Sequence, residues 1–124
     1  MKIRTGTDII EIERVKNAIE ETDGKLRDRV YTLAEVQYCE NKKAQKYQHY
    51  AGRFAAKEAV FKALSNTLDN KYEIEWKDIE IQNDDKGRPY VKLKEKFMLG
   101  IEDIDISISH CKEYAVATVA LIER

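Results

Sequence analysis

The spacing of apolar residues changes between the two halves of the chain, and this change constrains the fold more than any other feature. From residue 50 to about residue 68 the large apolar residues fall on one helical stripe, with alanines between them. Over residues 104–108 isoleucine alternates strictly with polar residues, which is the period of a half-buried strand. A mainly helical N-terminal half and a mainly stranded C-terminal half predict an α+β fold, with an antiparallel sheet packed on a long central helix.

The rest of the first half is expected to hold one strand and two shorter helices. In order, these are a strand over residues 2–10, a helix that ends at residues 22–24, a basic stretch, a helix over 33–43 and a connector over 42–48. Gly6 within the strand indicates close approach of another backbone. Thr32, followed three residues later by Glu35, predicts a capping box at the start of the 33–43 helix.

The second half is expected to form two hairpins. Its segments are strands at 79–81 and 90–93 around a turn at 83–87, a helical turn within 94–100, and strands at 104–108 and 114–122 around a turn at 110–113. The first turn is rich in asparagine, aspartate and glycine, the residues that favour tight turns.

The size and composition of the chain indicate a single domain over residues 1–124. Cys39 and Cys111 have neither metal-site spacing nor a disulfide framework around them, which favours reduced thiols. No secretory leader and no stretch long enough to span a bilayer is visible, so a soluble, cytoplasmic protein without a membrane partner is expected.

The formal net charge is only −1, but the basic residues are concentrated in the first half. This distribution suits an acidic protein partner, and an ordinary solvated face is the alternative. A nucleic-acid partner is not expected, because the chain is not strongly basic and its aromatic and basic residues do not interleave.

Three residues form the strongest candidate site. Asp8 follows a strand glycine, and Glu58 and Lys62 lie one turn apart on the central helix, at the edge of its apolar stripe, where both would be partly desolvated. Two carboxylates suit Mg²⁺, with Mn²⁺ as an alternative, and such an ion shares its remaining positions with water and substrate phosphate. A simple intrahelical ion pair between Glu58 and Lys62 is the competing interpretation.

Two other basic residues of the central helix have different expected roles. Lys57 falls within the apolar stripe, so it must extend to solvent or meet a carboxylate, and a structural role is expected. Arg53 could bind a phosphate, but a solvated side chain is the simpler interpretation.

Two short segments offer further ligand contacts. Gly87, before Arg88 and Pro89, permits a turn that a ligand can approach closely. Ser109 and His110 end a strand and could donate to a phosphate, although a surface position is the simpler interpretation for the histidine.

These segments together closely resemble the holo-acyl-carrier-protein synthase family, the small 4′-phosphopantetheinyl transferases. The matching segments are Gly6-Thr7-Asp8-Ile9 with Arg14 downstream, Gly52-Arg53-Phe54-Ala55-Ala56-Lys57-Glu58-Ala59 through Lys62, Asp84-Asp85-Lys86-Gly87-Arg88-Pro89, and Ile106-Ser107-Ile108-Ser109-His110. The resemblance runs through the chain in the family's order and spacing, and the Arg-Phe-Ala-Ala-Lys-Glu-Ala helix is its most specific part.

The resemblance implies transfer of 4′-phosphopantetheine from coenzyme A to a serine of apo-acyl carrier protein, with adenosine 3′,5′-bisphosphate as the second product. By position, Asp8 and Glu58 would bind Mg²⁺, and Lys62 would stabilise or protonate the leaving phosphate. The serine proton would go to Glu58 or to a water on the metal. This is the chemistry of fatty-acid and polyketide carrier proteins, and the sequence does not choose between them.

The resemblance also implies the remaining contacts. Coenzyme A would contact Arg53, Lys62, Gly87, Arg88, Pro89, Ser109 and His110. Arg14 would pair with the acidic recognition helix of the carrier protein, and the enzyme would be a homotrimer with active sites at its interfaces.

One departure from the family concerns residues 65–70, where glycines are usual and this chain has none. Asn66 or Asn70 is expected to take the left-handed conformation instead. A coenzyme A or nucleotide-binding regulator without turnover is the alternative function, although such a protein would not need all three site residues. A metal-dependent nuclease or phosphatase fits less well, because those nucleases usually place the second acid and the lysine two apart on a strand.

Overall fold

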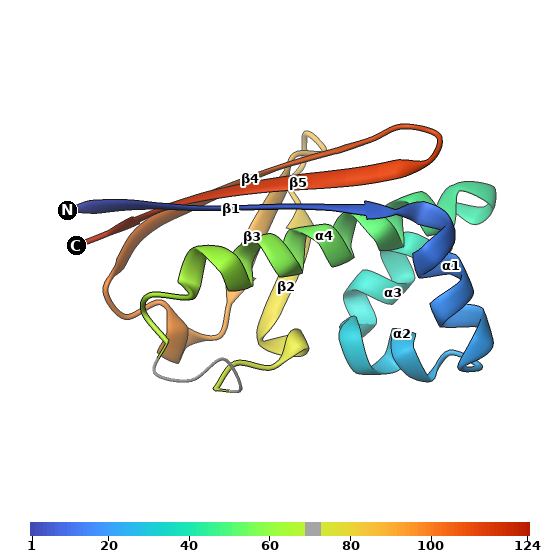
Figure 1. Ribbon diagram of the computed structural model, residues 1–124, viewed down its shortest axis with the longest axis horizontal. Coiled ribbons are helices and arrows are strands. Elements are labelled where there is room, and N and C mark those ends of the chain that lie inside the picture. Colours follow the sequence, from blue (N-terminus) through green and yellow to red (C-terminus); the bar gives the residue numbers. More distant parts are fainter. Residues whose placement is uncertain (69–72) are drawn as a thin grey trace.

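The computed structural model describes residues 1–68 and 73–124 and confirms the α+β prediction (Figure 1). The strands are β1 (Lys2–Glu11), β2 (Ile79–Asn83), β3 (Pro89–Leu93), β4 (Ile101–His110) and β5 (Tyr114–Glu123). The helices are α1 (Ile12–Glu21), α2 (Lys25–Val30), α3 (Leu33–Glu40) and α4 (Lys46–Leu64), with short 3₁₀ turns η1 (Lys43–Gln45), η2 (Trp76–Asp78) and η3 (Glu95–Phe97). The assignment of residues 1–124 to a single domain remains a prediction.

The strands form two antiparallel sheets. In the larger sheet β5 lies between β1 and β4, and Asp8 of β1 and Ile108 of β4 both pair with Ala117 of β5. Strands β2 and β3 form a separate hairpin. Both predicted hairpins and the predicted helical turn between them are therefore confirmed.

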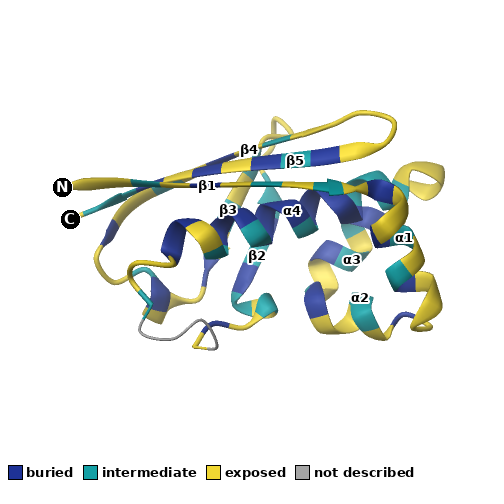
Figure 2. Cartoon of the chain, in the orientation of Figure 1, coloured by how far each residue is buried: buried dark blue, intermediate teal, exposed yellow. Residues whose placement is uncertain are grey.

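Helix α4 runs beneath the larger sheet and organises the core (Figures 1 and 2). Its alanines at positions 55, 56, 59 and 63 are buried, and their small side chains let the strands come close. The sheet covers one side of α4, while α1, α3 and β2 contact it elsewhere. The helix is consequently buried around most of its circumference, and the single apolar stripe predicted from the sequence is too narrow.

Gly6 is the point at which β1 meets α4. A Cβ atom placed on Gly6 would lie 2.0 Å from the backbone oxygen of Ala59, so only glycine fits without moving one of the two backbones. The predicted close approach is confirmed. Because side chains two residues apart on a strand share a face, Asp8 also points toward α4.

A second cluster of buried residues joins α1, α2 and α3 to the first half of α4. The Tyr31 hydroxyl, which follows α2, donates to the backbone oxygen of Tyr50 on α4 at 2.8 Å. Thr32 and Glu35 form the predicted capping box, since the Thr32 Oγ1 accepts from the Glu35 N–H and the Glu35 carboxylate accepts from the Thr32 N–H.

Several predicted boundaries are wrong. Residues 25–30, expected to be a basic connector, form α2. A six-residue helix is not stable by its own propensity, so the packing of its buried Val30 stabilises it. Helix α3 ends at Glu40 rather than residue 43, and Lys43, at a φ of 54°, separates it from α4. Helix α4 then begins four residues earlier than predicted, at Lys46.

Helix α4 also ends four residues earlier than predicted, because hydroxyl side chains bind its last carbonyls. The Ser65 Oγ donates to the backbone oxygen of Lys62, and the Thr67 Oγ1 donates to that of Leu64, each at 2.8 Å. Asn66 does not take the left-handed conformation that was predicted for Asn66 or Asn70, and the alternative, Asn70, lies outside the described residues.

The four described helices lie on one side of the larger sheet and leave its other face open (Figure 1). On this outer face Ile3 and Ile9 are 70% and 64% exposed. Within residues 1–68 and 73–124 no helix has the length and apolar character needed to cross a membrane.

Candidate functional site

Asp8, Glu58 and Lys62 meet where β1 crosses α4. The Lys62 Nζ lies 3.2 Å from the Asp8 Oδ1 and donates to the backbone oxygen of Thr7 at 2.8 Å. Lys62 thus pairs with the strand. No ion pair among the described residues joins it to Glu58, so the competing interpretation of an intrahelical pair is wrong. The Lys62 side chain is 53% exposed, so it is partly desolvated, as predicted, and still open to solvent.

Glu58 is half-buried beside Asp8, as the sequence predicted. Burial raises the pKa of the Glu58 carboxyl group, the charge of Asp8 raises it further, and Lys62 opposes both effects. Two acids therefore share one lysine, and that lysine is hydrogen-bonded to Asp8. This is an electrostatically unbalanced cluster that a bound cation would relieve.

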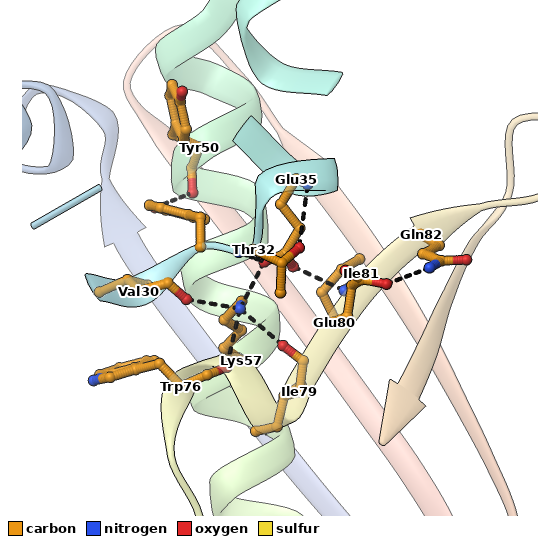
Figure 3. Close-up of polar contacts among 11 residues, drawn as sticks. Val30, Thr32, Glu35, Tyr50, Lys57, Trp76, Ile79, Glu80, Ile81 and Gln82 are labelled. Carbon is orange, nitrogen blue, oxygen red and sulfur yellow. Dashed lines mark hydrogen bonds and ion pairs between the residues drawn. The ribbon is translucent and has the colours of Figure 1, made fainter. Parts of the chain in front are cut away.

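Lys57, which directly precedes Glu58 on α4, forms the most buried ion pair of the described residues (Figure 3). Its Nζ lies 2.7 Å from the Glu35 Oε1, and both side chains are fully buried. The same Nζ donates to the backbone oxygens of Val30, Trp76 and Ile79 at 2.8, 3.0 and 2.8 Å. The predicted carboxylate partner and structural role of Lys57 are confirmed.

Glu35 connects this ion pair to the β2–β3 hairpin. Its Oε2 accepts from the backbone N–H of Ile81 at 2.8 Å, while its Oε1 accepts from Thr32 (Figure 3). Burial lowers the pKa of Lys57, and the adjacent Glu35 carboxylate raises it again. Helices α3 and α4 and strand β2 are therefore held together around one buried charge pair.

Arg53 is buried, so the expectation of a solvated side chain is wrong. It is 4% exposed, its guanidinium lies over the Tyr38 ring at 3.8 Å, and its Nη2 donates to the Asn83 Oδ1 at 2.5 Å. The Asn83 Nδ2 in turn donates to the backbone oxygen of Gly87 at 3.0 Å. Arg53 thereby connects α4 to the turn that carries Arg88 and Pro89.

The turn at Gly87 has the predicted conformation, with a φ of 82°. The Asp84 Oδ1 accepts from the backbone N–H groups of Lys86 and Arg88, each at 2.9 Å, which fixes the path of the turn. Arg88 and Pro89 line a hollow of about 330 Å³ together with Ser107, Ile108 and Thr118 of the larger sheet.

Ser109 and His110 are exposed at the end of β4, which agrees with the simpler interpretation for the histidine. The His110 ring lies 5.5 Å from the His49 ring of α4, centroid to centroid. Burial lowers the pKa of His49 to about 4, and the positive charges of Lys42, His110 and Arg53 contribute to the shift. His49 was not singled out by sequence reasoning, since only the folded chain brings it to His110.

Arg14 lies beside the acid cluster. It lines a hollow of about 400 Å³ with Asp8, Phe54 and Glu58 at the junction of α1, β1 and α4. An exposed arginine at the mouth of this hollow could meet an anionic partner approaching the two acids.

Asp8 and Glu58 are the residues that could hold a metal ion here. Within the described residues no group of three or more histidine, cysteine, aspartate or glutamate side chains is arranged to hold one. Two carboxylates alone suit Mg²⁺, which keeps several waters and takes oxygens from a phosphate ligand. The two cysteines carry free thiols, Cys39 buried and Cys111 exposed.

The model of the 4′-phosphopantetheinyl transferase superfamily matches residues 4–119, which include Asp8, Arg14, Glu58, Lys62 and His110. The chain belongs to this superfamily. The family and the enzyme class predicted from the sequence are therefore confirmed.

Curated relatives of this transferase are similar over nearly their full length. The holo-[acyl-carrier-protein] synthase of Ruminiclostridium cellulolyticum is 48% identical over 122 residues, which cover 94% of this chain and 90% of the relative. That of Geobacter sp. (strain M21) is 43% identical over 122 residues, which cover 94% and 95%.

Solved structures of the superfamily share the fold of this transferase. The Helicobacter pylori holo-[acyl-carrier-protein] synthase in complex with coenzyme A has a TM-score of 0.82 at 30% identity and covers 95% of this chain and 99% of its own. The ACPS–CoA complex of Chronobacterium ammoniagenes has a TM-score of 0.84 at 26% identity and covers 100% and 99%.

Proposed function

We propose that this transferase moves 4′-phosphopantetheine from coenzyme A to a serine hydroxyl of an apo-acyl carrier protein. A bond forms between the serine oxygen and the phosphorus that carries the pantetheine, and the bond from that phosphorus to the bridging oxygen breaks. Adenosine 3′,5′-bisphosphate leaves, and the serine proton balances its new charge. The observation that carries this proposal is the meeting of Asp8, Glu58 and Lys62 at one point on a chain of this superfamily.

Asp8 and Glu58 would hold Mg²⁺, or Mn²⁺ in its place. The closeness of the two acids supports this assignment: burial is the main cause that raises the pKa of Glu58, and the charge of Asp8 adds to it. When bound, the ion would offset negative charge on the pyrophosphate of coenzyme A.

Lys62 is placed to serve the leaving group. Its Nζ is tied to Asp8 and to the backbone oxygen of Thr7, but more than half of its side chain remains exposed and can reach a substrate. An ammonium group there stabilises the phosphate oxygen that leaves, or donates a proton to it. Glu58 is a candidate to receive the serine proton, because its half-buried carboxyl group lines the same hollow as Asp8 and Arg14.

The proposed coenzyme A contacts are divided between the two faces of the larger sheet. Asp8 pairs with buried Ala117 and faces α4, whereas Ser109 pairs with Val116, the adjacent position of β5, and faces the other way. Arg88 and Pro89 lie at the outer face with Thr118 and Ala120. In one chain these groups do not converge on Asp8.

We infer that two copies of the chain complete each site, as in a homotrimer with active sites between subunits. One copy would supply Asp8, Glu58 and Lys62, and its neighbour would supply Arg88, Pro89 and Ser109. The open outer face, with its exposed Ile3 and Ile9, offers the apolar surface for such an assembly. Gly87 shapes the turn, and Arg53 and His110 would complete the nucleotide contacts from the first half of α4 and the end of β4.

Arg14 would position the carrier protein. It shares its hollow with Asp8 and Glu58, so an acidic helix bound at Arg14 would present its serine next to the two acids. The partners of this transferase are thus coenzyme A and an acidic carrier protein.

Intact-protein mass spectrometry of an apo-acyl carrier protein incubated with this transferase, coenzyme A and Mg²⁺ tests the reaction. The wild-type chain should add one phosphopantetheine, while Asp8→Asn and Glu58→Gln should slow the addition by at least about a hundredfold. Glu102→Gln, a matched change at an exposed glutamate of β4, should not slow it. Equal rates in Glu58→Gln and Glu102→Gln would refute the assignment.

Mixing two inactive variants tests whether sites lie between subunits. Glu58→Gln lacks the acid cluster, and Arg88→Ala combined with Ser109→Ala lacks the proposed opposite half. Mixed subunits should regain a part of the wild-type rate, because some interfaces then contain two intact halves. No recovery in assemblies shown by native mass spectrometry to be mixed would contradict a shared site.

A further inference from the structure

Strand β2 has one edge that no other strand of the described residues covers, because its sheet contains only β2 and β3. Just beyond the end of β2, the Asp84 N–H donates to the Arg88 oxygen of the β3 side at 2.9 Å. Backbone groups alternate between the two edges of an antiparallel pair, so Ile79 and Ile81 present theirs to the uncovered edge. Both isoleucines are buried, and the groups on this edge therefore need partners other than water.

Glu35 and Lys57 take the place of a third strand on this edge (Figure 3). The Lys57 Nζ donates to the Ile79 oxygen, and the Glu35 Oε2 accepts from the Ile81 N–H, each at 2.8 Å. The two side chains form their own ion pair at 2.7 Å, and both are fully buried. A neighbouring strand would likewise offer a donor to one residue and an acceptor to the other, so the ion pair completes the hydrogen bonding of the edge.

The same ammonium group also holds two neighbouring segments. The Lys57 Nζ donates to the oxygen of Val30 at the end of α2 and to that of Trp76 in η2, at 2.8 and 3.0 Å. Hydrogen bonds require a particular distance and direction, whereas apolar burial is non-directional. The ion pair, rather than the apolar packing of Ile79 and Ile81, therefore fixes where β2 lies along α4.

A second attachment holds the other end of β2 to the same helix. Arg53 lies one turn before Lys57, and its Nη2 donates to the Asn83 Oδ1 at 2.5 Å. The Asn83 Nδ2 then donates to the backbone oxygen of Gly87 at 3.0 Å. Because β2 is attached to α4 at both of its ends, the turn between β2 and β3 has a fixed place relative to the helix.

This placement matters for the reaction, although neither Glu35 nor Lys57 is exposed to touch a substrate. Helix α4 carries Glu58, directly after Lys57, and Lys62, while the hairpin carries the turn proposed to contact the nucleotide. In the proposed assembly these two parts of one chain serve two neighbouring sites, so each subunit must keep them at a fixed separation. A misplacement of about 1 Å can lower a rate by roughly a hundredfold.

We propose that Glu35 and Lys57 are positioning residues of the transfer reaction, which hold the β2–β3 hairpin at one place along α4 and so set where the turn at Gly87 meets the nucleotide. This inference rests on the proposed function. A role in stability alone has a different consequence, because loss of folded protein lowers the apparent kcat and leaves the KM unchanged. The KM for coenzyme A and the Kd for adenosine 3′,5′-bisphosphate therefore separate the two roles.

A double variant, Glu35→Leu with Lys57→Met, tests the proposal without leaving an unpaired buried charge. Its KM for coenzyme A and its Kd for the bisphosphate, measured by calorimetry, should each rise about tenfold. Ile19→Ala, which removes a buried side chain from the second cluster, should lower stability and leave both values unchanged. Both variants are assayed at a temperature at which circular dichroism shows them folded. Wild-type values in the double variant, or equal rises in Ile19→Ala, would overturn the proposal.

Hydrogen exchange of the wild-type chain tests the same point without a variant. The Ile81 N–H should exchange as slowly as the buried amides of α4 in the ligand-free chain, because Glu35 accepts its hydrogen bond before any ligand binds. Fast exchange at Ile81 that only coenzyme A slows would show that the ligand orders the hairpin, and the proposal would be wrong. This measurement decides if the double variant does not fold.

The outcomes also separate this proposal from the proposed function. Absence of transfer and of coenzyme A binding in the wild-type chain would refute both. Normal transfer by the wild-type chain, together with an unchanged KM for coenzyme A in the folded double variant, would refute only the positioning role.

Discussion

Replacing Lys57 by methionine should destabilise this transferase far more than the same replacement of Lys62, only five residues further along α4. Lys57→Met leaves the Glu35 carboxylate fully buried without its cation and removes the donor from three backbone oxygens (Figure 3). Breaking a buried pair by removing one partner costs about 3–5 kcal/mol. Because a domain of this kind is stable by roughly 5–15 kcal/mol, much of the stability would be lost.

Lys62→Met is the matched control. Lys62 pairs with Asp8 at 3.2 Å, but its side chain is 53% exposed, so loss of this pair should change stability by less than about 1 kcal/mol. Its effect should instead appear as a loss of transferase activity. The two substitutions are chemically identical and lie on one helix, so a difference between them reports the surroundings of each lysine.

Urea unfolding followed by circular dichroism measures the two free energies. The account predicts a fall in the midpoint for Lys57→Met that corresponds to at least about 3 kcal/mol, and a Lys62→Met midpoint close to wild type. A double-mutant cycle that combines Lys57→Met with Glu35→Leu should show a large coupling energy, because the double variant leaves no unpaired buried charge. A cost below about 1 kcal/mol for Lys57→Met would refute the reasoning.

Three further predictions follow from other contacts. Gly6→Ala should lower the free energy of unfolding by about 1–3 kcal/mol or more and reduce activity, because its Cβ would lie 2.0 Å from the Ala59 oxygen. Gly100→Ala, in open space at a φ of 82°, should lower it by only about 1 kcal/mol. Thermal unfolding measures both, and equal losses would contradict the packing of β1 on α4. Glu58→Gln should stabilise the metal-free chain at neutral pH, since the raised pKa of Glu58 means that its ionised form opposes folding. The gain should vanish below about pH 4, where this glutamate is protonated in the folded and in the unfolded chain. A gain that persists at low pH would show that the charge of Glu58 is not its cause. Arg14→Ala should weaken carrier-protein binding and its salt dependence without changing coenzyme A affinity. Surface plasmon resonance measures both, with Lys94→Ala, a change at the residue after β3, as the control. Carrier binding and kinetics unchanged from wild type would remove the docking role.

The order of elements could be predicted from the sequence because local patterns determine it. Strict alternation of isoleucines in β4, turn residues before Gly87, and the Thr32–Glu35 capping box each predict structure within a few residues. The predicted ends of the helices were less accurate, because tertiary contacts decide where these helices begin and end. Residues 25–30 carry too few apolar positions to indicate a helix, and only the packing of Val30 shows why α2 forms.

The candidate site was predictable in part for the same reason. Asp8, Glu58 and Lys62 were recognisable from a family-like pattern, and the fold brings them together. Other contacts join residues far apart in the sequence: the pairing of Lys57 with Glu35, the burial of Arg53 against Tyr38, and the stacking of Trp76 on Phe54. No local signal marked Glu35 or Trp76 as partners of α4, so these contacts required the structure.

The most direct test of the central claim is to follow both products of one reaction. Apo-acyl carrier protein, coenzyme A and the wild-type chain are incubated with Mg²⁺, and carrier mass and free adenosine 3′,5′-bisphosphate are measured over time, with and without EDTA. The account predicts one phosphopantetheine on the carrier for each bisphosphate released, and neither product when EDTA is present. Bisphosphate release without a mass gain, or a mass gain that EDTA leaves unchanged, would contradict it.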